Sequence, residues 1–332
     1  MKILVVDVAA EHGGALTILN VFREKCEADL ANQYVFVLST PHFEDTENTR
    51  YLNYRWIKKS FIHRSLFDAF FIKRIIRREK PDKLLSLQNK AVAVSGIPQD
   101  VYFHNVLLIS DYKFGFGQSK KLWVYQHIIA PIVKRSLKKA DRIIVQAEWI
   151  KEQLHNKWGI DRALIEVQRP EISIVKTTAK SGENNSCELF YPAGGEIYKN
   201  HSVLLKACSA IWNERGADCG LKLILTCEKS SLSSECRALT EQGDYPISFV
   251  GRLSEAQMAE KYQSTILVFP SVLETMGLPL LEAEKYGATV IAADLEYAHE
   301  ALGDYSDAVY FNPSDYNELK SIIEKFLDKL SG

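Results

Sequence analysis

Two glutamates separated by seven residues are the first candidates for chemistry in this 332-residue chain. Glu274 and Glu282 enclose the segment Thr-Met-Gly-Leu-Pro, which follows an apolar run and precedes an apolar–polar pattern of helical period. A proline suits the first turn of a helix, where its missing N–H costs nothing. We therefore predict a strand, a turn that carries Glu274, and a helix that begins around residues 277–279.

This predicted turn also offers a place for an anion. The backbone N–H groups of Met276, Gly277 and Leu278 would point out of the helix N-terminus, an arrangement that binds phosphate groups. Glu282, about one turn further along, would accept hydrogen bonds from ribose hydroxyls, and Glu274 would reach a sugar. The segment therefore predicts a site for a nucleoside diphosphate joined to a sugar.

The segment resembles the E-x7-E signature of the retaining GT-B glycosyltransferases of family 4, also called group 1, which include bacterial lipopolysaccharide and O-antigen transferases. The likeness extends through residues 198–207, 249–254 and 287–294. In that family the first glutamate contacts the donor sugar near the reacting centre and the second binds the ribose. The resemblance assigns these roles to Glu274 and Glu282, and it implies retention of the anomeric configuration through front-face attack.

Lys199, just before a predicted helix, matches the family's lysine that binds the donor phosphates. One departure concerns the segment Ala193-Gly194-Gly195-Glu196, where many relatives carry a Gly-Arg pair whose arginine also binds phosphate. Arg252 follows a later strand that resembles the family's nucleobase cradle. We therefore expect Lys199 and backbone amides to stabilise the departing diphosphate.

The first half of the chain carries weaker signals. Gly13 and Gly14 follow a predicted strand and precede a helix, as does the family loop that approaches the donor phosphates, although such a pair is common after strands. His104 ends another predicted strand and resembles the family's histidine near the transferred sugar. A histidine satisfied within the core is the alternative interpretation.

The motifs that are absent from the sequence bear on metal and cofactor requirements. The chain has no D-x-D triplet, the motif with which transferases of the other major fold hold a divalent cation. We therefore predict no metal and no cofactor, the nucleotide sugar being a substrate. No GxGxxG fingerprint follows a strand, which disfavours an NAD-dependent oxidoreductase. A nucleotide-sugar epimerase of the same fold and a nucleotide-binding scaffold with a degraded site remain as alternatives.

The elements that must position these residues alternate between short apolar runs and amphipathic stretches, which predicts parallel sheets covered on both faces. Strands are expected at residues 3–8, 34–39, 83–87, 101–104, 142–146 and 164–167, and at 188–191, 222–226, 247–250, 266–269 and 289–293. Helices are expected at residues 15–26, 65–78, 120–139 and 148–158, and at 201–213, 255–263, 278–286 and 316–330.

We expect an α/β protein of the GT-B class, in which two Rossmann-like doubly wound domains enclose a cleft. The acceptor-side domain spans residues 1–170, a polar linker spans 171–187, and the nucleotide-sugar domain spans 188–332. Ligands of such sheets bind outside the carboxyl ends of the strands. Closure of the two domains would exclude water from the reaction.

The composition agrees with a cytoplasmic enzyme. Six scattered cysteines without a CxxC pair indicate reduced thiols rather than a zinc site. The N-terminus lacks the apolar region of a signal peptide, and no stretch approaches the ~20 apolar residues that span a bilayer.

Charge is distributed unevenly. Residues 1–169 hold 27 Lys and Arg against 18 Asp and Glu, whereas residues 170–332 hold 14 against 24. Residues 54–80 interleave aromatics with Lys and Arg, which is typical of a segment on an anionic membrane surface. The alternative is a helix that packs on the sheet with solvated charges. We expect a lipid-linked saccharide acceptor, peripheral contact with the cytoplasmic face of the inner membrane, and no nucleic acid partner.

Overall fold

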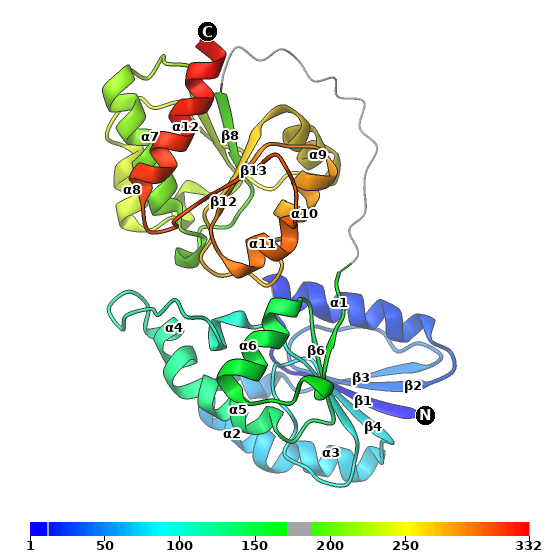
Figure 1. The fold of residues 1–332 in the computed structure, drawn as a ribbon. Helices are drawn as coiled ribbons and strands as arrows, with labels where there is room; N and C mark the ends of the chain where they lie inside the picture. The colour runs from blue at the N-terminus through cyan, green and yellow to red at the C-terminus, as the bar shows by residue number, and fades with distance from the viewer. Residues whose placement is uncertain (12, 171–186, 332) are drawn as a thin grey trace. The chain divides into compact units, whose positions relative to one another are not determined.

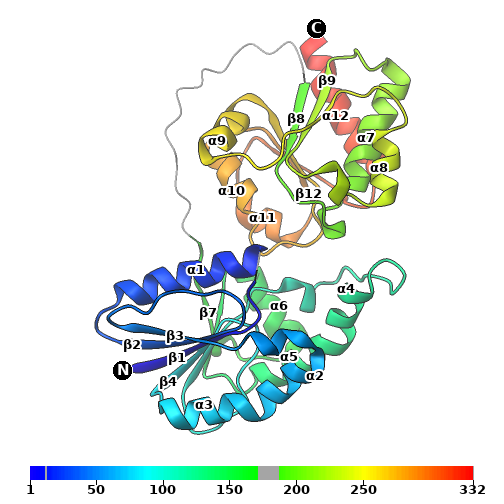
Figure 2. The same ribbon diagram turned by 180° about the vertical axis from the view of Figure 1, so that it is seen from behind.

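The structure is a computed structural model that describes residues 1–11, 13–170 and 187–331. The chain divides into two compact units, Met1–Arg169 and Pro170–Gly332. Each unit is a parallel sheet with helices on both faces (Figures 1 and 2), which confirms the predicted doubly wound folds. The predicted linker lies outside the described residues, except for Cys187, which begins the first strand of the second unit.

The first unit contains a seven-stranded sheet of order β3-β2-β1-β4-β5-β6-β7, in which all neighbouring strands are parallel. The strands of this sheet are β1 (Lys2–Asp7), β2 (Gln33–Leu38), β3 (Thr49–Asn53), β4 (Lys83–Ser86), β5 (Gln99–Tyr102), β6 (Arg142–Val145) and β7 (Ile165–Val167). Strand order reverses between β1 and β4, so the loops after these two strands begin at the switch point where ligands of such sheets bind.

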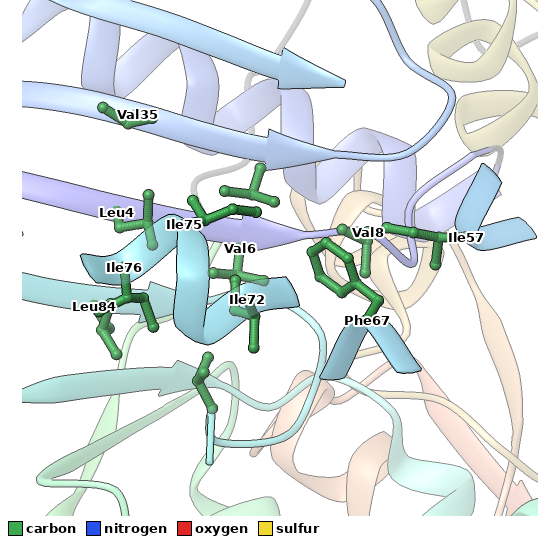
Figure 3. Close-up of a cluster of buried hydrophobic side chains, with 12 residues drawn as sticks. Leu4, Val6, Val8, Val35, Ile57, Phe67, Ile72, Ile75, Ile76 and Leu84 are labelled. Carbon is green, nitrogen blue, oxygen red and sulfur yellow. The ribbon is translucent and has the colours of Figure 1, made fainter. Parts of the chain in front are cut away.

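Helices cover both faces of this sheet, with α1 on one side and α3 on the other (Figures 1 and 2). They are α1 (Gly13–Ala28), α2 (Phe61–Leu66), the π-helical turn η2 (Phe67–Phe71), α3 (Ile72–Glu79), α4 (Lys120–Val124), the π-helical turn η4 (Tyr125–Ile129), α5 (Ala130–Leu137) and α6 (Glu148–Trp158). The run from α2 to α3 packs Phe67, Ile72 and Ile76 on β1 and its neighbours (Figure 3).

The second unit contains a six-stranded parallel sheet of order β10-β9-β8-β11-β12-β13. Its strands are β8 (Cys187–Tyr191), β9 (Leu221–Leu225), β10 (Ile247–Phe249), β11 (Ile266–Phe269), β12 (Val290–Ala293) and β13 (Ala308–Phe311). Its helices are α7 (His201–Arg215), α8 (Ser234–Thr240), α9 (Glu255–Ser264), α10 (Leu278–Lys285), α11 (Glu296–Leu302) and α12 (Tyr316–Ser331). Here strand order reverses between β8 and β11.

Cysteines are unpaired and mostly buried in both units. Burial raises the pKa of the Cys26 and Cys187 thiols to about 12 and that of Cys227 to about 11. These thiols therefore behave as small apolar side chains. Within the described ranges, no helix is both long and apolar enough to cross a bilayer.

Candidate active site

An ion pair joins the loops that leave β8 and β11 in the second unit. Lys199 Nζ lies 2.6 Å from Glu274 Oε1, and the two side chains are only 19% and 15% exposed. The residues are 75 positions apart in the sequence. Because β8 and β11 are neighbouring parallel strands at the reversal of strand order, their carboxyl ends bring the two loops together. Two residues selected from the sequence therefore meet at the edge where ligands bind.

The loop that carries Lys199 is held by several hydrogen bonds. The Tyr191 hydroxyl donates to the Lys199 carbonyl oxygen at 2.7 Å, and the Val272 N–H donates to the Tyr198 carbonyl oxygen at 2.9 Å. Asn200 adopts a left-handed conformation with φ 57° and precedes α7. Its Nδ2 donates to the carbonyl oxygens of Pro270 and Pro313 at 3.1 and 2.8 Å. The position of Lys199 is thus set by the loop after β11, which also carries Glu274.

Helix α10 begins at Leu278, immediately after a glycine in the left-handed conformation. Gly277 has φ 61°, and a Cβ at this position would lie 3.0 Å from Leu280 Cδ1 and 3.2 Å from Tyr297 Cδ2. Both the left-handed conformation and the crowding favour glycine. The neighbouring Met276 is buried, whereas Leu278 is exposed. This turn sets the direction of the first N–H groups of α10, the proposed ligands of a diphosphate.

Glu282 lies on α10, one turn from its start, and interacts with α9. The Tyr262 hydroxyl donates to Glu282 Oε2 at 2.6 Å. Burial raises the pKa of Glu282, and the Tyr262 hydrogen bond opposes that rise because it stabilises the ionised form. One carboxylate oxygen is therefore held by a buried tyrosine that sequence reasoning did not identify.

His104 lies after β5 in the first unit, where Asn89 braces it. Asn89 has φ 64°, and its Oδ1 accepts hydrogen bonds from the N–H groups of His104 and Asn105 at 2.7 and 2.8 Å. His104 Nε2 lies 3.1 Å from the Leu87 carbonyl oxygen and 3.0 Å from Asn89 Nδ2. The first contact requires a proton on Nε2 and the second an unprotonated Nε2, so a neutral ring makes one of them at a time.

The His104 ring is neutral at physiological pH. Burial lowers the pKa of His104 to about 4. The centroid of its ring lies 5.8 Å from that of the Tyr102 ring. A neutral imidazole can accept or donate a hydrogen bond but carries no charge to stabilise a leaving group. Its chemistry therefore suits contact with a sugar hydroxyl.

Gly13 and Gly14 form the first turn of α1 instead of a loop before it. Among the described residues, none has an atom within 4 Å of a Cβ built at Gly14, so packing inside the first unit does not require glycine there. Gly195 differs, because a Cβ there would lie 2.6 Å from the Ser231 backbone. Close packing thus accounts for glycine in the segment that replaces the family's Gly-Arg pair.

The predicted site residues fall into two groups, one in each unit. The second unit brings Lys199 and Glu274 into contact, and α10 with the turn before it carries Met276, Gly277, Leu278 and Glu282. The first unit carries Gly13, Gly14 and His104. Asn89 and Tyr262 are additions from the structure. Asparagine is the residue other than glycine that most readily adopts left-handed φ, a signal that Asn89 shares with Asn200.

Comparison with known families accounts for most of the chain. Residues 177–330 match the family model described as glycosyl transferases group 1, and residues 25–170 match glycosyltransferase family 4. The O-antigen chain mannosyltransferase RfbU of Salmonella typhimurium is 21% identical over 196 residues, which are 58% of this chain and 53% of RfbU. The chain thus spans about half the length of that curated relative.

Solved structures share the fold over nearly the whole chain. Sucrose-phosphate synthase from Thermosynechococcus elongatus has a TM-score of 0.72 and 16% identity, with 99% of this chain and 90% of that one covered. HepE from Anabaena, solved with UDP-glucose, has a TM-score of 0.67 and 15% identity, with 100% and 91% covered. Both likenesses support the GT-B fold expected from the sequence.

Proposed function

Because the chain belongs to the group 1 glycosyltransferases, we propose that it moves a sugar from a nucleotide-sugar donor to a saccharide acceptor. The observation that carries this proposal is the 2.6 Å contact between Lys199 Nζ and Glu274 Oε1, made where strand order reverses. A cation and a carboxylate placed together at this edge suit a substrate that presents a diphosphate beside a sugar.

Each residue of the second unit has a separate task in the proposed reaction. Lys199 and the first N–H groups of α10 stabilise the negative charge that develops on the departing nucleoside diphosphate. Glu274 accepts hydrogen bonds from hydroxyls of the transferred sugar, and Glu282 accepts them from the ribose. In the free protein Glu274 neutralises Lys199. When the donor binds, its diphosphate pairs with Lys199 in place of Glu274. The Glu274 carboxylate is then available to the sugar.

The proposal includes retention of the anomeric configuration and independence of metal ions. Lys199 and the start of α10 already supply positive charge where a metal would otherwise act. Proton NMR of the product reports the configuration, and activity should persist in EDTA. An inverted product would refute retention, and a loss of activity restored by magnesium would refute metal independence.

We further infer that the acceptor is a lipid-linked saccharide of a surface polysaccharide such as O-antigen. RfbU, an O-antigen chain mannosyltransferase, supports the pathway, although that relative is matched over only about half its length. The basic first half of the chain supports an acceptor on an anionic membrane. We propose that the enzyme acts at the cytoplasmic face of that membrane.

Thermal shift measurements with UDP-, GDP-, ADP- and dTDP-sugars test the donor site. A ligand at a hundred times its dissociation constant stabilises the native state by about 2.7 kcal/mol. We expect a shift with one nucleotide class, lost in Lys199→Met and Glu282→Gln. Lys206→Met is the matched control, because Lys206 pairs with Glu235 on the surface of the same unit.

Three outcomes separate the alternatives. A shift lost in Lys206→Met as well would refute the site assignment. Conversion of the donor to an epimer without any acceptor would identify an epimerase. Failure of every nucleotide to bind would refute a functional donor site and favour a scaffold.

A further inference from the structure

The helical run from α2 through α3 carries two apolar stripes instead of one. The inner stripe, which includes Phe67 and Ile72, packs on the sheet (Figure 3). The outer stripe is exposed to solvent, with Phe61 72% and Phe70 67% accessible. The outer stripe comprises Phe61, Ile62, Leu66, Phe70 and Phe71. Packing against the sheet therefore explains only part of this aromatic segment.

The π-helical turn η2 explains how both stripes arise. Phe67 and Ile72 both face the core, yet they are five residues apart, which in an α-helix would separate them by about 140°. The Ile72 N–H instead bonds to the Phe67 carbonyl oxygen, five residues back, so one residue is inserted into the turn. Phe70 and Phe71, which lie between the two core residues, are thereby turned outward. The exposed aromatics are a consequence of the backbone and not of a frayed end.

Positive charge surrounds the outer stripe. Residues 55–80 hold nine Lys and Arg against two acidic residues, a net charge of +7. Both acidic residues are already neutralised, because Asp68 pairs with Arg64 and Lys90, and Glu79 pairs with Lys2, Arg50 and Arg78. The exposed cations Lys59, Lys73, Arg74 and Arg77 lie on the same helical run or just before it. Their long side chains can extend apolar stems beside the aromatics while the charges reach a polar surface.

This combination selects one kind of partner. A second copy of the chain would present the same basic face, so a symmetric contact between two stripes would bring like charges together. A bilayer with anionic headgroups offers an apolar region for the aromatics and negative charge for the cations at the same depth. We propose that the outer stripe and its flanking cations dock the first unit on an anionic bilayer, with the helical run lying in the headgroup region.

The docking surface rests on the proposed function and extends it. It would contact the membrane that carries the lipid-linked acceptor. It is tested without any donor. The full chain is sedimented with vesicles of phosphatidylcholine alone and with vesicles that also contain phosphatidylglycerol. We expect binding to the anionic vesicles, weakened by salt, and weak binding to the neutral ones.

Two double variants separate the apolar and the electrostatic contributions. Phe61→Ser with Phe70→Ser, and Lys73→Glu with Arg74→Glu, should each lower vesicle affinity by roughly tenfold or more. Leu30→Ser is the matched control, because Leu30 is exposed on the turn after α1, away from the stripe. All variants should melt like the parent chain and keep its donor-induced thermal shift, since the substituted residues belong to the first unit, whereas Lys199 and Glu282 belong to the second.

Failure of the parent chain to bind anionic vesicles would overturn the proposal, as would unchanged binding by the serine variant. Binding that is equal with both vesicle types would overturn the role of the cations. A dimer that dissociates in the serine variant, with no vesicle binding, would identify a second copy as the occupant instead. Vesicle binding without any donor-induced shift would leave the docking surface intact and refute the proposed transferase.

Discussion

Removal of the Tyr262 hydroxyl should destabilise the protein in a pH-dependent way. Tyr262→Phe keeps the ring, which packs on Phe190 and Tyr286, but deletes the 2.6 Å hydrogen bond to Glu282 Oε2. A hydrogen bond to a charged group contributes about 1.5–3 kcal/mol, and one between neutral groups about 0.5–1.5 kcal/mol. We therefore expect the variant to lose about 1.5–3 kcal/mol of unfolding free energy over the pH range in which the folded parent carries an ionised Glu282.

The sign of the pH dependence follows from the raised pKa of Glu282. In the folded protein this carboxyl binds its proton more tightly than its ordinary value of 4.5 implies. Its contribution to stability is thus present below the unfolded pKa and is lost as pH rises through the folded pKa. Without Tyr262 the folded pKa rises further. The difference between variant and parent should therefore shrink as pH falls toward 4, because both then carry a neutral Glu282.

Thermal unfolding of the full chain between pH 4 and 8 measures this difference, about 2–4 °C for each kcal/mol. Tyr305→Phe is the control, because its hydroxyl donates at 2.8 Å to the neutral Ala288 carbonyl oxygen. Its effect should stay constant over this range. The acid limb of the pH profile of donor binding should also move to higher pH in Tyr262→Phe, because loss of the hydrogen bond raises the pKa of Glu282 further. A Tyr262→Phe effect that is independent of pH, or that grows on acidification, would refute the reasoning.

Substitutions at Glu274, Gly277 and Asn89 test the local geometry. Glu274→Gln leaves Lys199 partly buried without its counter-charge, so we expect the free energy of unfolding measured in urea to fall by about 1–3 kcal/mol. The double variant with Lys199→Met should lose less than the sum of the two single variants. Gly277→Ala should cost about 1–2 kcal/mol for its left-handed backbone, with further loss from the contact with Leu280, and weaken donor binding in calorimetry. Asn89→Asp keeps the oxygen that accepts from His104 and Asn105, whereas Asn89→Ala deletes it, so kcat should fall at least about tenfold further in the alanine variant. Equal rates for the two Asn89 variants, additive losses for the ion pair, or a stable Gly277→Ala chain with unchanged affinity would each contradict the corresponding geometry.

The alternating strands and helices were readable from the sequence because central parallel strands are buried on both faces. Such strands appear as continuous apolar runs, as in β1, β2 and β11. The two strands missing from the prediction, β3 (Thr49–Asn53) and β13 (Ala308–Phe311), both lie at sheet edges. Strand β3 has Thr49, Arg50 and Asn53 among its five residues and therefore lacks a continuous apolar run. Strand β13 is a four-residue apolar strand, and the edge strands β7 and β10 were predicted, so edge position does not account for its omission. The short helices α8 and α11 were missed because seven residues hold less than two full periods.

The candidate site was predictable residue by residue but not as an arrangement. Glycine and proline in the sequence predict the turn before α10. The contact between Lys199 and Glu274 instead depends on the order of the strands in the sheet, which the local sequence does not specify. Tyr262 reaches Glu282 from another helix, and Asn89 acts on a loop that follows a different strand. Neither contact has a sequence period that would reveal it. The segment 54–80 likewise offered two interpretations, and the structure shows that its apolar residues divide between the core and the surface.

The buried thiols allow the opening rate of each unit to be measured separately by thiol alkylation. Cys26 is the single cysteine of the first unit, whereas the other five belong to the second. Because burial keeps most of these thiols protonated and out of reach, an alkylating reagent reacts with them only when the surrounding unit opens. Mass spectrometry after timed alkylation would therefore record how often each half opens, and whether a nucleotide sugar slows the second half alone or both together.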